Sequence, residues 1–233
     1  MQKTIEFLES FLSDARLERL KEVLLSRIKN ITIILDNLLD SHNTSAVIRT
    51  AEGLGLTDVY VVEQDYQFEI NKAVTKYSHK WINIHRFKKC EKCLTQVKQK
   101  GYKIFVANVS RNAKPLNKIP ITPGVKYAFV FGNEHSGISS ESKKLSDGEF
   151  FIPMYGFTES FNVSVAAAIT LSYVSYNYRK FLRKNTDLER RDIEKLYFEY
   201  LKKAVKNSDI ILKSFNEREK QSNNTWNEGK IVK

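Results

Sequence analysis

The feature that most restricts the fold is a repeated alternation between short apolar runs and segments with helical spacing of apolar residues. The runs at 31–35, 59–63 and 127–131 have the length and the β-branched or aromatic content of buried strands. The segments 43–54 and 89–100 have helical spacing, and each is closed by a glycine. Strands that alternate with helices form a mostly parallel sheet with helices on both faces. The sequence therefore predicts an α/β fold.

The same patterns extend the prediction along the chain. Further strands are expected at 81–87, 102–109 and 150–154, and further helices at 4–29, 140–145, 163–178 and 188–206. Residues 207–233 are polar and are expected to fray. The chain then divides into an N-terminal helical extension (1–29), a central α/β domain (30–178), and a C-terminal helical extension with a polar tail (179–233).

The charge balance favours a polyanionic partner, because 38 Lys and Arg outnumber 27 Asp and Glu and give a net charge of +11. The acidic N-terminus does not resemble a secretory signal, and the most apolar run, 163–174, is too short to span a bilayer. Two cysteines provide no disulfide framework. We therefore expect a reduced, soluble, cytoplasmic protein without a membrane partner.

Residues 37–55 form the first of three segments that can carry chemistry. At about 100° per residue, Arg49 points almost opposite to the apolar face of the predicted helix. Arg49 can therefore reach a ligand or a partner. In the alternative interpretation, Asn43 caps the helix and Arg49 pairs with Glu52 on a solvated face.

The second segment, 132–139, follows a predicted buried strand and contains two glycines. Its spacing imitates the Walker A loop that cradles phosphates, but Ile138 stands where the lysine of that loop must reach them. Glu134 would also bring a negative charge into the cradle. The segment therefore argues against a nucleoside triphosphate, while its glycines allow a ligand to approach the backbone closely. The alternative is a plain turn.

The third segment, 152–174, runs from the end of a predicted strand, through a loop with Gly156, into a helix that begins near 160–162. Unpaired N–H groups at the start of that helix suit a carboxylate or another anion. The helix is rich in Ala, Val and Ser all round, so it is expected to be buried on every side. The alternative is a capped core helix, which does not explain the polar residues before it.

Together, the three segments resemble the three ordered motifs of the SpoU branch of the SPOUT methyltransferases. The resemblance rests on an Asn six residues before Arg-Thr-Ala, on a Gly-Asn-Glu-x-x-Gly loop, and on Ile-Pro-Met-x-Gly leading into Ser-x-Asn-Val-Ser-Val-Ala. These motifs lie at Asn43 with 49–51, at 132–137 and at 152–166. Phe161 replaces the leucine that the family usually has there, and both residues are apolar.

The resemblance implies an α/β domain whose C-terminal part is threaded into a deep trefoil knot, with an active site beside the interface of a homodimer. It implies S-adenosyl-L-methionine as the methyl donor, a ribose 2′-oxygen of RNA as the acceptor, and no metal. The short N-terminal segment and the helical C-terminal extension are similar to those of tRNA (guanosine-18-2′-O)-methyltransferases. The alternatives are ribosomal RNA or another tRNA position as the substrate, and RNA binding without catalysis.

The resemblance also implies roles for individual residues. Arg49 would be the central catalytic residue, either deprotonated with help from an RNA phosphate or charged and stabilising the developing alkoxide. Four more residues would shape the catalytic site, namely Asn43, Glu134, Ser160 and Asn162. The loops that follow the strands would hold the methyl donor, at Asn108, Gly132, Ile152, Met154, Phe161 and Ser164.

Two basic segments are candidates for RNA contacts. Residues 76–103 hold nine Lys and Arg and one acid, with aromatic residues between them, and residues 176–206 hold ten Lys and Arg and five acids. The alternative is a solvated helix face with the aromatic residues in the core. Cys90 and Cys93 form one CxxC without a second pair or a flanking His, which argues against a zinc site.

Overall fold

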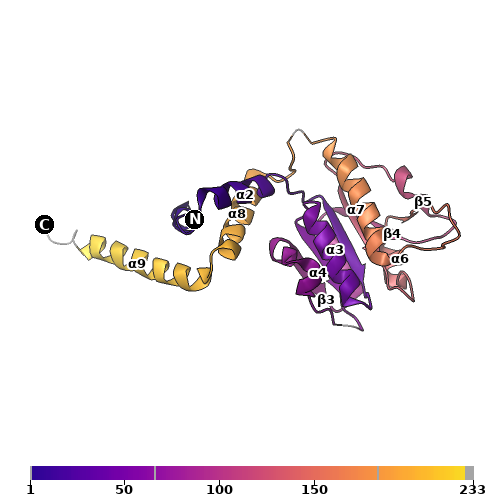
Figure 1. The fold of residues 1–233 in the computed structure, drawn as a ribbon, viewed down its shortest axis with the longest axis horizontal. Coiled ribbons are helices and arrows are strands. Elements are labelled where there is room, and N and C mark those ends of the chain that lie inside the picture. The colour runs from indigo at the N-terminus through magenta and orange to yellow at the C-terminus, as the bar shows by residue number, and fades with distance from the viewer. Residues whose placement is uncertain (1, 66, 183, 229–233) are drawn as a thin grey trace. The chain divides into compact units, whose positions relative to one another are not determined.

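The computed structural model describes residues 2–65, 67–182 and 184–228, with side chains as far as residue 218. The chain forms two compact units, whose ribbons are drawn in Figure 1. One unit is Leu25–Leu188, and the other combines the residues up to Leu24 with those from Glu189 onward. The second unit therefore combines parts of both predicted extensions, 1–29 and 179–233, while 25–29 and 179–188 belong to the unit Leu25–Leu188.

The unit Leu25–Leu188 is built around a seven-stranded sheet in the order β3-β2-β1-β6-β4-β7-β5. Each adjacent pair of strands is parallel in this described part of the chain, so the predicted parallel α/β fold is confirmed. The strands are β1 (Ile31–Asp36), β2 (Asp58–Val62), β3 (Asn83–Phe87), β4 (Tyr102–Ala107), β5 (Lys114–Pro115), β6 (Lys126–Phe131) and β7 (Gly148–Phe151).

Helices cover both faces of this sheet, and Figure 1 shows α3, α4 and α7 on one of them. On one face lie α3 (Ser41–Gly53), α4 (Lys72–Thr75), the 3-10 helix η1 (Ser78–Trp81) and α7 (Val163–Arg179). On the other face lie α5 (Cys90–Gln99) and α6 (Ser140–Leu145). The 3-10 helix η2 (Leu116–Lys118) follows β5, and its Leu116 belongs to the core on the side of α3 and α7. β1 contributes side chains to the cores on both faces of the sheet. Ile33 and Leu35 belong to the core under α3 and α7, and Ile34 belongs to the core under α5.

The helix predicted at 163–178 forms as α7, but it is not buried on every side. Ala167 and Leu171 are fully buried, whereas Val165 is 45% exposed and Tyr176 is 66% exposed. The prediction failed because apolar residues occupy the exposed side of this helix as well as its buried side. An apolar helix face therefore lies open on the chain.

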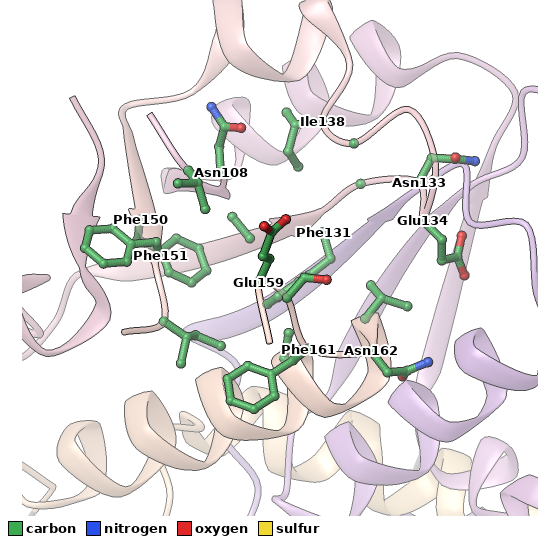
Figure 2. Close-up of a pocket in the computed structure, with 18 of the residues that line it drawn as sticks. Asn108, Phe131, Asn133, Glu134, Ile138, Phe150, Phe151, Glu159, Phe161 and Asn162 are labelled. Carbon is green, nitrogen blue, oxygen red and sulfur yellow. The ribbon is translucent and has the colours of Figure 1, made fainter. Parts of the chain in front are cut away.

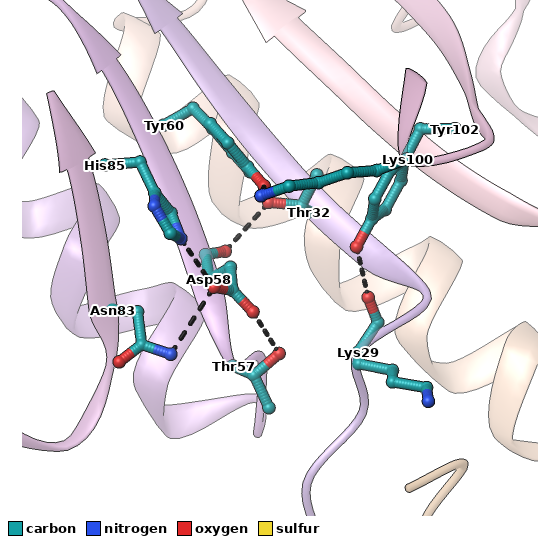
Figure 3. A network of polar contacts seen from close by, with 9 residues as sticks. All are labelled: Lys29, Thr32, Thr57, Asp58, Tyr60, Asn83, His85, Lys100 and Tyr102. Atoms are coloured by element: carbon teal, nitrogen blue, oxygen red, sulfur yellow. Dashed lines mark hydrogen bonds and ion pairs between the residues drawn. The ribbon is translucent and has the colours of Figure 1, made fainter. Parts of the chain in front are cut away.

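Polar contacts tie the strands together at the amino-terminal edge of the sheet (Figure 3). Asp58 at the start of β2 accepts a hydrogen bond from Thr57 Oγ1 at 2.6 Å and contacts His85 Nε2 of β3 at 2.6 Å. Lys100 Nζ donates to the Tyr60 hydroxyl at 2.9 Å. Burial opposes ionisation of Asp58, but the contacts with His85 and Thr57 lower its pKa. The network joins β2 to β3 at the edge opposite the carboxyl ends of the strands.

The second unit consists of helices from both ends of the chain. These helices are α1 (Gln2–Glu9), α2 (Asp14–Leu24), α8 (Arg190–Ala204) and α9 (Ser208–Glu228). The single helix predicted at 4–29 is interrupted after α1, where Ser10 Oγ bonds back to the Phe7 carbonyl at 2.7 Å. Leu8 and Leu201 are fully buried in this unit.

The prediction that residues 207–233 fray was wrong for Ser208–Glu228, which form α9. Phe215 of α9 stacks on Phe7 of α1 with ring centroids 4.2 Å apart, a contact that local sequence does not reveal. The last part of the predicted tail, 229–233, lies outside the described residues. Within the described residues, no helix combines the length and apolar character needed to cross a membrane.

Candidate active site

A cavity of about 670 Å³ lies where β4, β6 and β7 end, and the segment before α7 closes one side of it (Figure 2). This is the edge at which open parallel sheets bind ligands. Eight of the predicted site residues line the cavity, namely Asn108, Gly132, Glu134, Ile152, Met154, Ser160, Phe161 and Asn162. The other three, Asn43, Arg49 and Ser164, do not line it.

The loop after β6 requires glycine at position 132. A Cβ atom on Gly132 would lie 2.2 Å from the carbonyl oxygen of Gly137, which no side chain could tolerate. The Asn133 side chain fixes the turn, because its Oδ1 accepts two backbone N–H groups and its Nδ2 donates to the Asn37 carbonyl at 2.8 Å. The result is a tight turn that is attached to the chain after β1 and presents its backbone at the cavity wall.

Three predicted catalytic residues form one chain of hydrogen bonds. Glu134 accepts the Leu39 N–H at 2.9 Å with one carboxylate oxygen and Asn43 Nδ2 at 3.0 Å with the other. Asn43 Oδ1 accepts from Asn162 Nδ2 at 3.2 Å. Asn162 Oδ1 then accepts the Ser164 N–H at 2.9 Å and so caps α7. Residues from all three motifs are thereby held together at the margin of the cavity.

Replacing Glu134 by glutamine is expected to lower the free energy of unfolding by about 1 kcal/mol at neutral pH. Leu39 N–H and Asn43 Nδ2 both donate to the Glu134 carboxylate. The amide nitrogen of glutamine is itself a donor, so it would face one of these two donors and one hydrogen bond would be lost. Burial opposes ionisation of Glu134, but the hydrogen bonds from Leu39 and Asn43 lower its pKa below the ordinary value of 4.5.

The stabilisation by Glu134 is therefore complete above pH 4.5 and is lost as the pH falls through the lower pKa of the folded state. Urea denaturation of the wild type and of Glu134→Gln at several pH values measures this effect. A difference in stability between the two proteins that persists unchanged in acid would contradict the assignment.

Arg49 lies on the exposed side of α3, as its helical position predicts. Its Nη1 donates to the Val74 carbonyl at 3.2 Å, which places the guanidinium against α4 rather than in the cavity. The alternative pairing with Glu52 does not form, because Glu52 instead pairs with the buried Arg27 at 2.5 Å. The guanidinium is thus available to a partner outside the chain.

The cap of α3 is Asp40 rather than Asn43. Asp40 Oδ1 accepts the His42 N–H at 2.7 Å, which satisfies the start of the helix. The Asn43 side chain is therefore free to bind Glu134. Six residues separate Asn43 from Arg49, or about 9 Å along the helix axis. One predicted catalytic residue of α3 therefore lies at the margin of the cavity, and the other lies more than a turn further along the helix.

The SpoU rRNA Methylase family model matches residues 30–172, which include the whole sheet and most of α7. The chain belongs to the SpoU methylase family.

Two proteins similar to this SpoU chain are named tRNA (guanosine(18)-2′-O)-methyltransferase. The one from Borreliella burgdorferi is 37% identical over 212 residues, which cover 90% of this chain and 94% of that protein. The one from Aquifex aeolicus is 32% identical over 192 residues, which cover 81% and 90%. The crystal structure of the A. aeolicus TrmH/SpoU tRNA modifying enzyme has a TM-score of 0.74 at 30% identity and covers 83% of this chain and 98% of that one.

A buried carboxylate, Asp36 at the end of β1, is a site feature of this SpoU chain that sequence reasoning missed. Asp36 is 3% exposed and accepts hydrogen bonds from Ser139 Oγ at 2.6 Å and Ser142 Oγ at 2.8 Å. These bonds attach the start of α6 to β1 and hold the far end of the loop that begins at Gly132. The sequence does hold a signal for this residue, because Asp36 is an acid directly after the apolar run 31–35, where a buried charge needs hydrogen-bond partners.

The two cysteines are buried in the core that α5 covers. Burial raises the pKa of the Cys90 thiol to about 11 and raises that of Cys93 as well, so both thiols stay protonated and unreactive. Among the residues that the structure describes, no three His, Cys, Asp or Glu side chains gather in a way that could hold a metal ion.

Proposed function

We propose that this chain transfers a methyl group from S-adenosyl-L-methionine to the ribose 2′-oxygen of guanosine 18 in the tRNA D-loop. The observation that carries the proposal is the hydrogen-bonded chain of Asn43, Glu134 and Asn162, which joins the three motifs beside one cavity. The two similar proteins named for this activity are covered over at least 90% of their length. The similarity is therefore not confined to a shared catalytic domain.

The cavity fits the proposed methyl donor. Its volume lies within the range of small-molecule sites, and its walls combine apolar side chains with the open backbone at Gly132. We assign the binding of the donor to Asn108, Gly132, Ile152, Met154 and Phe161, with Ser164 acting through Asn162. When bound, the donor supplies a methyl group that its positive sulfur makes electrophilic, and no metal is assigned to the reaction.

We assign to Arg49 the binding of an RNA phosphate and the stabilisation of the alkoxide that forms as the 2′-hydroxyl loses its proton. A planar guanidinium can donate two parallel hydrogen bonds to a phosphate, and that of Arg49 is exposed. Glu134, Asn43 and Asn162 hold the cavity margin rigid, and Ser160 lines the cavity beside them. Together these residues would position the 2′-oxygen for in-line attack.

The RNA surface that we propose begins beside Arg49. The carbonyl that Arg49 contacts belongs to Val74, two residues before the basic segment 76–103. Lys76 and Lys80 are exposed in that segment, and Tyr77 is 56% exposed with the Lys80 ammonium 5.0 Å from its ring centroid. Exposed cations beside an exposed aromatic ring suit phosphate contacts combined with base stacking. The basic segment 176–206 is the second candidate surface.

We further propose that the enzyme works as a homodimer. The open apolar face of α7, with Val165 and Tyr176, is the surface that a second copy would cover, and Phe161 at the cavity is 39% exposed nearby in sequence. Sedimentation analysis is expected to give twice the mass of the chain. A mass equal to one chain at micromolar concentration would contradict the dimer.

The knot implied by the family is also part of the proposal. β7 is later in sequence than β5, yet it lies between β4 and β5 in the sheet, so the chain must enter a position between strands that precede it. We place the knotted catalytic domain at residues 30–178, with the helical extensions before and after it in the sequence, at 1–29 and 179–233. Because tRNA is the proposed substrate, we place the enzyme in the cytoplasm.

Transfer of labelled methyl from S-adenosyl-L-methionine to an unmodified tRNA transcript tests the function. A matched transcript without guanosine at nucleotide 18 and a ribosomal RNA fragment are assayed beside it. Label on the first transcript alone is expected. Label on ribosomal RNA alone would support the proposed methyl transfer but show that the substrate is ribosomal RNA rather than tRNA. No label on any RNA, together with no binding of the donor, would favour RNA binding without catalysis.

A further inference from the structure

The cavity is acidic although the chain is basic. Among the described residues that line it, the ionisable side chains are Glu134 and Glu159, with no Lys, Arg or His. The whole chain carries a net charge of +11, so an acidic lining runs against its overall composition. Carboxylates gathered in a partly enclosed site favour a positively charged ligand.

The two carboxylates differ in what they bind. Both oxygens of Glu134 accept hydrogen bonds within the chain, from Leu39 and Asn43. Glu159, in contrast, extends into the cavity from the segment before α7 (Figure 2), and it has no hydrogen-bond or ion-pair partner among the described residues. Its charge is therefore available to a ligand.

Asn108 adds a second acceptor to the cavity lining (Figure 2). Its Nδ2 donates to Glu149 Oε2 at 2.9 Å, and Ser110 Oγ donates to the same oxygen at 2.5 Å. An ionised carboxylate can only accept, so the amide nitrogen of Asn108 must face Glu149, and its Oδ1 is left for a ligand. The hydrogen bonds from Ser110 and Asn108 also lower the pKa of Glu149, which keeps this arrangement charged at neutral pH.

Methyl transfer removes a positive charge from the ligand. The bond between the methyl carbon and sulfur breaks, its electron pair returns to sulfur, and the carbon bonds to the 2′-oxygen, whose proton is released. The sulfonium donor thus becomes a neutral thioether, S-adenosyl-L-homocysteine. A carboxylate near the ligand therefore attracts the donor more strongly than the thioether, which keeps the same amino and carboxylate groups but has lost the positive charge on sulfur.

We propose that Glu159 makes the cavity prefer the sulfonium donor over its thioether product. This inference rests on the proposed function, because it takes the methyl donor of that reaction as the ligand. Glu159 would then favour exchange of the spent product for fresh donor without taking part in the chemical step.

Binding of the two ligands to Glu159→Gln, measured by isothermal titration calorimetry without RNA, tests the proposal. We expect the affinity for S-adenosyl-L-methionine to fall by roughly fivefold and that for S-adenosyl-L-homocysteine to stay unchanged. Glu159→Asp should retain the preference of the wild type. Glu141→Gln removes the same charge from an exposed position on α6 that does not line the cavity, and it should change neither affinity.

Salt provides a second readout. The preference of the wild type for the charged ligand should decrease as ionic strength rises, and that of Glu159→Gln should not. The proposal would be overturned if Glu159→Gln lowered the affinities for both ligands equally, or if it changed neither affinity. If the wild type binds neither ligand, the proposed methyl donor itself is wrong, and the inference fails with it.

Discussion

Replacing Arg49 by alanine is expected to reduce methyl transfer by at least about a hundredfold while tRNA binding persists. Arg49 is exposed, and its hydrogen bond to the Val74 carbonyl holds it at the surface, so its removal leaves no cavity in the core. The loss would come from the group assigned to the phosphate and the developing alkoxide. Single-turnover transfer at saturating tRNA measures the rate, and a gel-shift titration measures the binding.

The conservative variant Arg49→Lys separates charge from geometry. Lysine keeps the positive charge but lacks the planar fork that binds a phosphate through two hydrogen bonds. We expect its activity to stay well below that of the wild type. An Arg49→Ala enzyme that retains full activity would show that the role implied by the family does not apply to this chain.

Replacing Gly132 by alanine is expected to destabilise the protein by about 2–4 kcal/mol and to abolish binding of the methyl donor. The added Cβ would lie 2.2 Å from the Gly137 carbonyl oxygen and 2.7 Å from the Ile138 nitrogen. Both are backbone atoms, so the clash cannot be relieved by a side-chain rotation. The loop must open, and the wall of the cavity changes with it.

Gly53→Ala is the matched control for this prediction. Gly53 lies in α3, and an added Cβ there would meet no heavy atom within 4 Å. Alanine is the better helix former, so this variant should be as stable as the wild type or up to about 1 kcal/mol more stable. Urea denaturation and calorimetric titration with the donor compare the two variants. Equal stability and equal binding of Gly132→Ala and Gly53→Ala would contradict the geometry of the loop.

The central strands β1, β2 and β6 were predictable because they are buried on both faces. The two-residue strand β5 was not predicted, because it is too short to form an apolar run. All six residues of β1 are buried, so that strand stands out in the sequence as an apolar run. The strand predicted at 81–87 begins later, at Asn83, because Ser78–Trp81 form a 3-10 helix. The order of the strands was not predictable from periodicity, because it depends on contacts between segments that are far apart in the sequence.

The candidate site was predictable only in part. Motif positions indicated Gly132 and Asn162, which the structure brings to one cavity. Local patterns alone favoured Asn43 as the N-cap of the helix. The helix begins earlier, at Ser41, so Asp40 is the N-cap and Asn43 lies inside the first turn. The contact between Asn43 and Glu134 joins residues 91 positions apart, so no local pattern could reveal it.

The arrangement of the chain ends has a consequence for folding during synthesis. The helices α1 and α2 leave the ribosome before the strands of the sheet, but they pack against α8, which is made after those strands. Ile31 of β1 likewise pairs with Tyr127 of β6, about a hundred residues later. Such distant contacts make folding slow. The helices α1 and α2 must therefore wait until the whole sheet has been made before α8 can cover their apolar faces.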